Sequence, residues 1–285
     1  MYMPMIHNYM FHLIQKKPGD LDCAIAKLQN CISDIKDWMT ANKLKLNDSK
    51  TEFFVAASPH NFKNVLPSDI TLTIGNEDIK PAKTIRNLGA FFDSQMTMSS
   101  HVTNVSKTVI FHLRNIGRIR KYIDQPTCHH AVRSLILSRL DYCNGLLSSL
   151  PSTHIIRLQR LQNWAARIIY EVDRTHSSAP LLKSLHWLPI HHRIIFKSLL
   201  FVYKCLHNQG PAYLSDCLSV YVPKRQLRSS NDYLRLSYPI TRVLAGDRTF
   251  TVFASREWNK LPVYIRQSSS TNIFKKALKT YLFPN

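Results

Sequence analysis

The feature that most constrains the fold is a change in the spacing of apolar residues near residue 95. Before this point, one segment has apolar residues at helical spacing and later short runs alternate with polar residues, which indicates a helix and a small antiparallel sheet. After about residue 97, apolar residues recur at three- and four-residue steps, which indicates successive amphipathic helices. We therefore expect an α+β fold, with a mixed part at 18–95 and a mainly helical part at 96–285.

The first part is expected to begin with a helix from Leu21 to Met39, because its apolar residues follow helical steps. Asp20 is placed to cap this helix and Asn42 to end it. Strands are expected at 51–57, at Ile70–Ile74 and at Ile85–Phe92, with Gly75-Asn76 as a turn into Ile79.

The second part is expected to contain several helices in succession. Helical spacing predicts them at 100–121, 128–147, 152–169, 190–207 and 272–283, with Ser100 and Ser152 as caps and Gly210-Pro211 as a stop. The segment 221–256 mixes Tyr, Leu, Arg, Ser and Pro, and indicates loops with one short pair of strands.

The charge of the chain is strongly positive and unevenly distributed. Lys and Arg number 38 against 18 Asp and Glu, a net charge of +20. Residues 1–93 carry 11 basic and 10 acidic side chains, whereas residues 94–285 carry the other 27 basic and 8 acidic ones. A polyanion would relieve this self-repulsion, so nucleic acid is the expected partner. An anionic membrane surface and a merely basic protein without such a partner are the alternatives.

The helix expected at 100–121 concentrates this charge. No acid lies between Asp93 and Asp124. Lys107, Arg114, Arg118 and Lys121 follow steps of seven, four and three, so they share one helical face, and Arg120 lies among them. We expect these five cations to contact phosphates without reading bases. The alternative is a face that only keeps the protein in solution.

Neither a metal site nor a nucleophilic catalytic set is expected. The six cysteines form no CxxC pair, and adjacent side chains such as Cys128-His129-His130 diverge on a helix. We expect reduced thiols in an intracellular protein, no membrane-spanning segment and no secretory signal. The four tryptophans are expected to be packing anchors, and His101 a capping or packing residue. The tryptophans are Trp38, Trp164, Trp187 and Trp258.

Six ordered blocks resemble the C-terminal region of LINE-type (non-LTR, jockey-like) retrotransposon reverse transcriptases. They are WMTANKLKLNDSKTEFF (38–54), NLGAFFDSQMTMSSHV (87–102), SRLDYCNGLLSSLP (138–151), RLQRLQNWAARII (157–169), REWNKLPVYIR (256–266) and FKKALKTYLF (274–283). Together they extend over nearly all of the chain after Pro18. The resemblance implies a remnant of the polymerase palm with its primer-grip hairpin at 18–95, and a thumb with a C-terminal region at 96–285.

The resemblance also implies which chemistry is missing. The family performs RNA-directed DNA synthesis with two Mg²⁺ ions held by aspartates, two of them in a Tyr-Ala-Asp-Asp turn. In register, that turn falls near Ile6-His7-Asn8-Tyr9, and the sequence contains no Asp-Asp pair. We therefore expect no catalytic residue, no metal and no cofactor in this chain. Lys50, which the resemblance places near the nucleotide phosphates, is a weak accessory candidate beside the alternative of a solvated lysine.

The expected retained function is sequence-tolerant binding of RNA, DNA or their hybrid, in the nucleus, the cytoplasm or both. Two alternatives stay open. The chain is a decayed relic that binds nothing specifically, or it is half of a polymerase that is active only when another chain supplies the aspartates.

Overall fold

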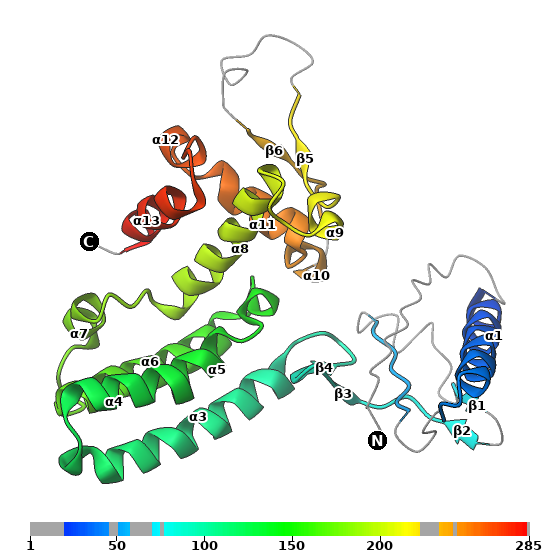
Figure 1. Ribbon diagram of the computed structural model, residues 1–285, viewed down its shortest axis with the longest axis horizontal. Coiled ribbons are helices and arrows are strands. Elements are labelled where there is room, and N and C mark those ends of the chain that lie inside the picture. Colours follow the sequence, from blue (N-terminus) through cyan, green and yellow to red (C-terminus); the bar gives the residue numbers. More distant parts are fainter. Residues whose placement is uncertain are drawn as a thin grey trace. The chain divides into compact units, whose positions relative to one another are not determined.

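The computed structural model describes residues 20–45, 51–57, 70–74, 77–222, 234–241 and 244–283. The chain forms two compact units, Met1–Met96 and Thr97–Asn285. Helices and short antiparallel sheets occur together, which agrees with the expected α+β class. The helices dominate, as Figure 1 shows.

The first unit begins with helix α1 (Asp20–Ala41), close to the predicted span. Its end is fixed locally, as expected from Asn42, whose side-chain amide donates to the Trp38 carbonyl at 2.8 Å. Lys43 then takes a left-handed conformation, with φ of 57°. Met39 is buried, but Trp38 is 56% exposed, so its predicted role as a packing anchor is wrong. Adjacent positions on a helix lie about 100° apart, and only Met39 continues the inward stripe.

Two β-hairpins follow. Strands β1 (Leu72–Ile74) and β2 (Glu77–Ile79) pair antiparallel, which confirms the hairpin predicted there. The single strand predicted from Ile85 to Phe92 is instead the hairpin β3 (Thr84–Asn87) and β4 (Ala90–Asp93).

The turn between β3 and β4 explains the difference. Leu88 and Gly89 both have positive φ, 45° and 85°. Positive φ at both central residues is the geometry of a two-residue hairpin turn that matches strand twist. The strand predicted at 51–57 is also wrong, since only Phe53 forms a bridge there, to Pro81.

The second unit is a succession of helices (Figure 1). In chain order they are α3 (Ser99–Ile119), η2 (Arg120–Tyr122), α4 (Gln125–Val132), the π-helical turn η3 (Arg133–Leu137), α5 (Ser138–Asp141), η4 (Asn144–Leu147), α6 (Ser152–Tyr170), α7 (Ser178–Ser184), α8 (Ile190–Leu206), α9 (Ala212–Ser215), α10 (Leu244–Asp247), α11 (Phe250–Asn259), α12 (Val263–Arg266) and α13 (Thr271–Leu282). A short pair, β5 (Ser219–Val220) and β6 (Leu236–Ser237), lies between α9 and α10.

Two neighbouring groups of helices make the core of this unit. Helices α3, α4 and α6 contact one another, and α6 also contacts α8. Helix α8 in turn packs against η4, α11 and α13. Fully buried side chains lie in both groups, including Leu113, Leu158, Ile169, Tyr203, Trp258 and Phe274.

Most predicted helices are confirmed, with two corrections. The helix expected at 128–147 is interrupted by the π-helical turn η3 and again at Cys143, where φ is 52°. Segment 221–256 was predicted as loops with one strand pair, but α11 begins inside it at Phe250. Among the described residues, no helix has both the length and the apolar character needed to cross a bilayer.

Candidate nucleic-acid interface

Helix α3 is held in place by one apolar stripe. Val102, Val109, Leu113 and Ile116 are each at most 3% exposed and follow steps of seven, four and three. This stripe lies on the side of α3 that packs against α6. The opposite side of the helix is therefore left facing solvent.

The solvent side carries the predicted cations. Lys107, Arg114 and Arg118 of α3 are exposed, as is Lys121 of η2, and these four residues are here called the outer basic face. Within the described residues, no hydrogen bond or ion pair occupies the side chain of Lys107, Arg114 or Arg118. Their charges are free for an external anion.

The outer basic face also has a hollow. Lys107, Arg114 and Arg118 line it together with Ile110, Phe111 and Asn115, and its volume is about 370 Å³. Cations thus surround a small apolar patch on the exposed side of one helix.

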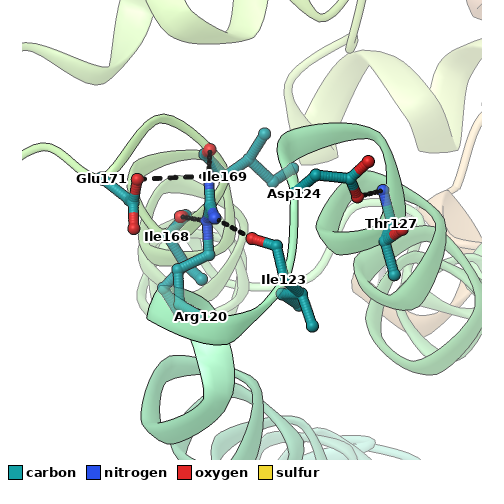
Figure 2. Close-up of polar contacts among 7 residues, drawn as sticks. All are labelled: Arg120, Ile123, Asp124, Thr127, Ile168, Ile169 and Glu171. Carbon is teal, nitrogen blue, oxygen red and sulfur yellow. Dashed lines mark hydrogen bonds and ion pairs between the residues drawn. The ribbon is translucent and has the colours of Figure 1, made fainter.

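Arg120 does not belong to this face. Its side chain is 12% exposed and points to the end of α6, as Figure 2 shows. Nε donates to the Ile168 carbonyl at 3.0 Å and Nη2 to the Ile169 carbonyl at 2.9 Å, while Nη1 donates to the Ile123 carbonyl at 2.7 Å. Glu171 adds an ion pair at 3.4 Å. Every branch of this guanidinium is occupied inside the protein, so phosphate contact does not suit Arg120.

The sequence contained a signal for this difference. Arg120 follows Ile116 by four residues and Leu113 by seven, so it continues the buried stripe of α3. Carbonyls in the last turn of a helix lack the usual helical donors; the Glu171 N–H reaches the Ile168 carbonyl at 3.3 Å, and Arg120 donates to the carbonyls of Ile168 and Ile169.

The acids near this end of α3 are also engaged. Asp124 caps α4, and its Oδ1 accepts from the Thr127 backbone N–H at 3.0 Å (Figure 2). These hydrogen bonds from Thr127 lower the pKa of Asp124. Glu171 is directed to Arg120. Neither carboxylate pairs with a cation of the outer basic face.

Helix α6 extends the positive surface at one edge. Arg157 is exposed, and its Nη1 lies 3.4 Å from the Thr103 hydroxyl of α3. The sequence predicted phosphate-binding cations only in the helix that is now α3, because Arg157 comes beside that helix only in the folded structure.

Several polar side chains of block 138–151 have structural roles. Asp141 forms a two-point ion pair with Arg193, whose Nε donates to Oδ1 at 2.7 Å and whose Nη2 contacts Oδ2. Asn144 is buried, and the Ser148 hydroxyl donates to the Arg248 carbonyl at 3.1 Å. These contacts join the block to α8 and to Arg248.

Block 157–169 has a similar role. Gln162 is fully buried, and its Nε2 donates to the Leu188 carbonyl at 2.9 Å. Gln159 Oε1 accepts from the Ile190 backbone N–H at 2.8 Å, at the first residue of α8. Pro189 cannot cap α8 with its side chain, so Gln159 of α6 satisfies one of the free N–H groups there.

The C-terminal blocks build an aromatic core. The ring of Phe274 stacks on Tyr203 with centroids 4.2 Å apart and also lies 5.9 Å from Trp258. Trp258 is fully buried, and its Nε1 donates to the Leu234 carbonyl at 2.8 Å. Trp187 is buried too, so both tryptophans are packing residues as predicted, while Trp164 is half-buried.

Among the described residues, the adjacent histidines and the cysteines form no recognisable ligand set. His129 stacks on Trp187, with ring centroids 5.8 Å apart, and burial lowers its pKa. His101 is 2% exposed, and burial lowers its pKa as well, which suits the expected packing role. All six cysteines are free thiols. Across the described ranges, no three His, Cys, Asp or Glu side chains are grouped to hold a metal ion. Lys50 lies outside those ranges.

Comparison with known proteins adds no relative. No family model, no curated protein and no solved structure matches this chain.

Proposed function

We propose that this chain is the C-terminal part of a LINE-type reverse transcriptase and binds RNA, DNA or RNA–DNA hybrid without sequence preference. In this proposal the first unit is a palm remnant with the primer-grip hairpin, and the second is the thumb with the C-terminal region. The six sequence blocks, in their order, support the family. The observation that carries the binding proposal is the outer basic face, with its exposed cations and no paired acid among the described residues.

The arrangement suits phosphate contact. Lys107, Arg114 and Arg118 project from one side of a helix whose other side is fixed in the core. Positioning contacts to phosphates need such cations and carry no base information. Each contact releases condensed counterions, so affinity would fall steeply as salt rises.

The proposal assigns no polymerase activity to residues 1–285. Nucleotide transfer through two metal ions needs clustered carboxylates, and the sequence has no Asp-Asp pair. A relic without binding and a half-enzyme completed by another chain are the competing outcomes.

Fluorescence anisotropy with a labelled RNA–DNA primer–template, titrated across a salt series with Mg²⁺ and nucleotides present, separates retained binding from the relic. Primer extension after mixing with a chain that carries the missing aspartates tests the half-enzyme. We expect micromolar or tighter binding at low salt and no primer extension by this chain alone. The triple variant Lys107→Ala/Arg114→Ala/Arg118→Ala is expected to lower the slope of log affinity against log salt by about 1 for each lost contact.

A matched variant separates this face from total charge. Lys27→Ala/Lys183→Ala/Lys276→Ala removes the same charge from exposed positions on three other helices. We expect this control to keep most of the wild-type slope. Equal losses in both variants would show non-specific attraction, no saturable binding by folded protein would leave the relic, and extension would contradict the inactive assignment.

A further inference from the structure

The outer basic face has an exposed aromatic ring among its cations. Phe111 is 60% exposed and lies four residues after Lys107 and three before Arg114. With these two residues it lines the 370 Å³ hollow on α3. A ring of this size loses favourable burial while it stays in water, so an apolar partner for its face would be stabilising.

The ring is well placed to receive a flat partner. Its helix is anchored through the buried stripe that ends at Ile116. His112 contacts Phe111 edge-on, with ring centroids 5.3 Å apart and an angle of 74° between the rings. An edge contact supports the Phe111 ring without covering both of its faces.

The surrounding charge selects the class of partner. An apolar protein segment would cover Phe111 but leave Lys107, Arg114 and Arg118 without counterions. A nucleotide supplies both a flat π-face, from its base, for Phe111 and a negative charge, from its phosphate, for the cations. In a duplex the bases are stacked on one another, so a helix lying on the backbone would press Phe111 against phosphate and sugar.

We propose that Phe111 is a stacking platform for an unpaired base, so that the outer basic face prefers single-stranded RNA or DNA to a duplex. The flanking Lys107 and Arg114 hold the phosphates on either side of that base. This inference rests on the proposed nucleic-acid binding and specifies its substrate.

A second exposed aromatic ring, that of Tyr122, lies near the outer basic face. Tyr122 of η2 is 75% exposed, and Lys121 Nζ lies 4.8 Å from the centre of its ring. Phe111 and Tyr122 are eleven positions apart in sequence, or roughly 16 Å along a helical axis at about 1.5 Å per residue. Two aromatic platforms with cations between them suit a strand of several unpaired nucleotides.

The test compares full-length wild type and Phe111→Ala on labelled oligo(dT) and on a blunt duplex with the same number of phosphates. We expect wild type to prefer oligo(dT). Phe111→Ala should weaken oligo(dT) binding roughly five- to a hundredfold and duplex binding less than about twofold, with the salt slope unchanged because no charge is lost. Tyr213→Ala, which removes a ring that is 70% exposed on α9, is the matched control and should alter neither affinity.

The possible results separate this inference from the proposed function. Wild-type binding to both probes, with Phe111→Ala unchanged or weakened equally on each, would overturn the stacking inference and leave nucleic-acid binding intact. Absence of wild-type binding to either probe would overturn both. Phe111→Trp gives an independent readout, since its added fluorescence should be quenched by oligo(dT) and not by the duplex.

Discussion

Arg118 and Arg120 are two residues apart and have opposite environments. Arg118 is exposed on the outer basic face, whereas Arg120 is 12% exposed and binds three backbone carbonyls and Glu171 (Figure 2). The acid-free stretch that contains both arginines predicts the same role, contact with phosphates, for each of them. Their positions around the helix distinguish them: Arg118 lies on the face of the exposed cations, and Arg120 continues the buried stripe.

Arg120→Ala is expected to destabilise the protein by about 2–4 kcal/mol, because it removes three charged hydrogen bonds to backbone carbonyls. Arg120→Lys should recover only part of this, since an ammonium cannot reproduce the fork of donors. Urea unfolding followed by circular dichroism at 222 nm measures the effect. Arg118→Ala is the control and should change stability by less than about 0.5 kcal/mol; an equal effect of both substitutions would contradict the assigned roles.

Protonation of the half-buried His129 gives a second prediction. Burial, followed by the nearby His130 and Arg133, lowers the pKa of His129 in the folded state. The unfolded chain, with a histidine pKa of about 6.5, then binds more protons than the folded one in the interval below that value. Stability is therefore expected to rise with pH through this interval and to fall on acidification.

His129→Phe should keep the stacking on Trp187 and remove the titrating group. The variant is expected to lose less stability than wild type between pH 7.5 and pH 5.5, as measured by thermal unfolding. His176→Gln is the control, because His176 is exposed and is not among the groups that lower the pKa of His129; this variant should retain the wild-type pH dependence. A wild-type slope in His129→Phe would place the pH dependence elsewhere.

Among the secondary-structure elements, the sequence predicted the long helices but not the short or irregular segments. The stripe from Val102 to Ile116 predicts α3, and α8 and α13 were found near their predicted bounds. The interruption at Cys143 and the two-residue turn at Leu88-Gly89 carry little periodic signal, because each depends on the φ of one or two residues.

The same limit applies to the candidate site. The spacing of Lys107, Arg114 and Arg118 was sufficient to place them on one exposed face. Phe111 was missed although it lies within that face, because an isolated Phe in a helix is usually read as core. Arg157 could not be found, since its position depends on how α6 packs against α3.

The junction of α6 with α8 gives a prediction at this scale. Gln162→Leu keeps the volume but leaves the Leu188 carbonyl without its donor, and it removes one of the two acceptors of Gln159 Nε2, which keeps Asn163 Oδ1. We expect a loss of roughly 1–3 kcal/mol in the free energy of unfolding. The exposed Gln267→Leu is the control, for which a change within about 0.5 kcal/mol is expected. A neutral Gln162→Leu would show that water or a shifted side chain satisfies the carbonyl.

For the whole molecule, the uneven charge coincides with its division into two units. The unit Thr97–Asn285 contains α3, α6 and α8 with their common core, and residues 94–285 carry 27 of the 38 basic side chains. The proposed nucleic-acid binding is therefore expected to reside mainly in this part of the chain.

A fragment comprising residues 97–285 is expected to fold alone, because it contains the helical core, and to keep the outer basic face. Its affinity for the primer–template should stay within about threefold of that of the full chain, a difference well below the roughly 1.4 kcal/mol that corresponds to a factor of ten. Circular dichroism and anisotropy at one fixed salt concentration check the two parts of this prediction. A helical, cooperatively unfolding fragment that has lost binding would show that residues 1–96 supply essential contacts.

The direction of α3 affects how the positive electrostatic potential varies along the helix, and so how evenly it would attract a nucleic-acid strand. The helix begins at Ser99 and ends at Ile119, and Arg118 and Lys121 lie near its C-terminus. The aligned peptide dipoles place about half a negative charge at that end and half a positive charge at the other. The dipole therefore lowers the potential near Arg118 and Lys121 and raises it toward the N-terminal side, where Lys107 is the one member of the outer basic face. In the proposed binding, a more uniform potential would give a nucleic-acid strand little preference for one register, and would favour sliding along α3 over fixed positioning.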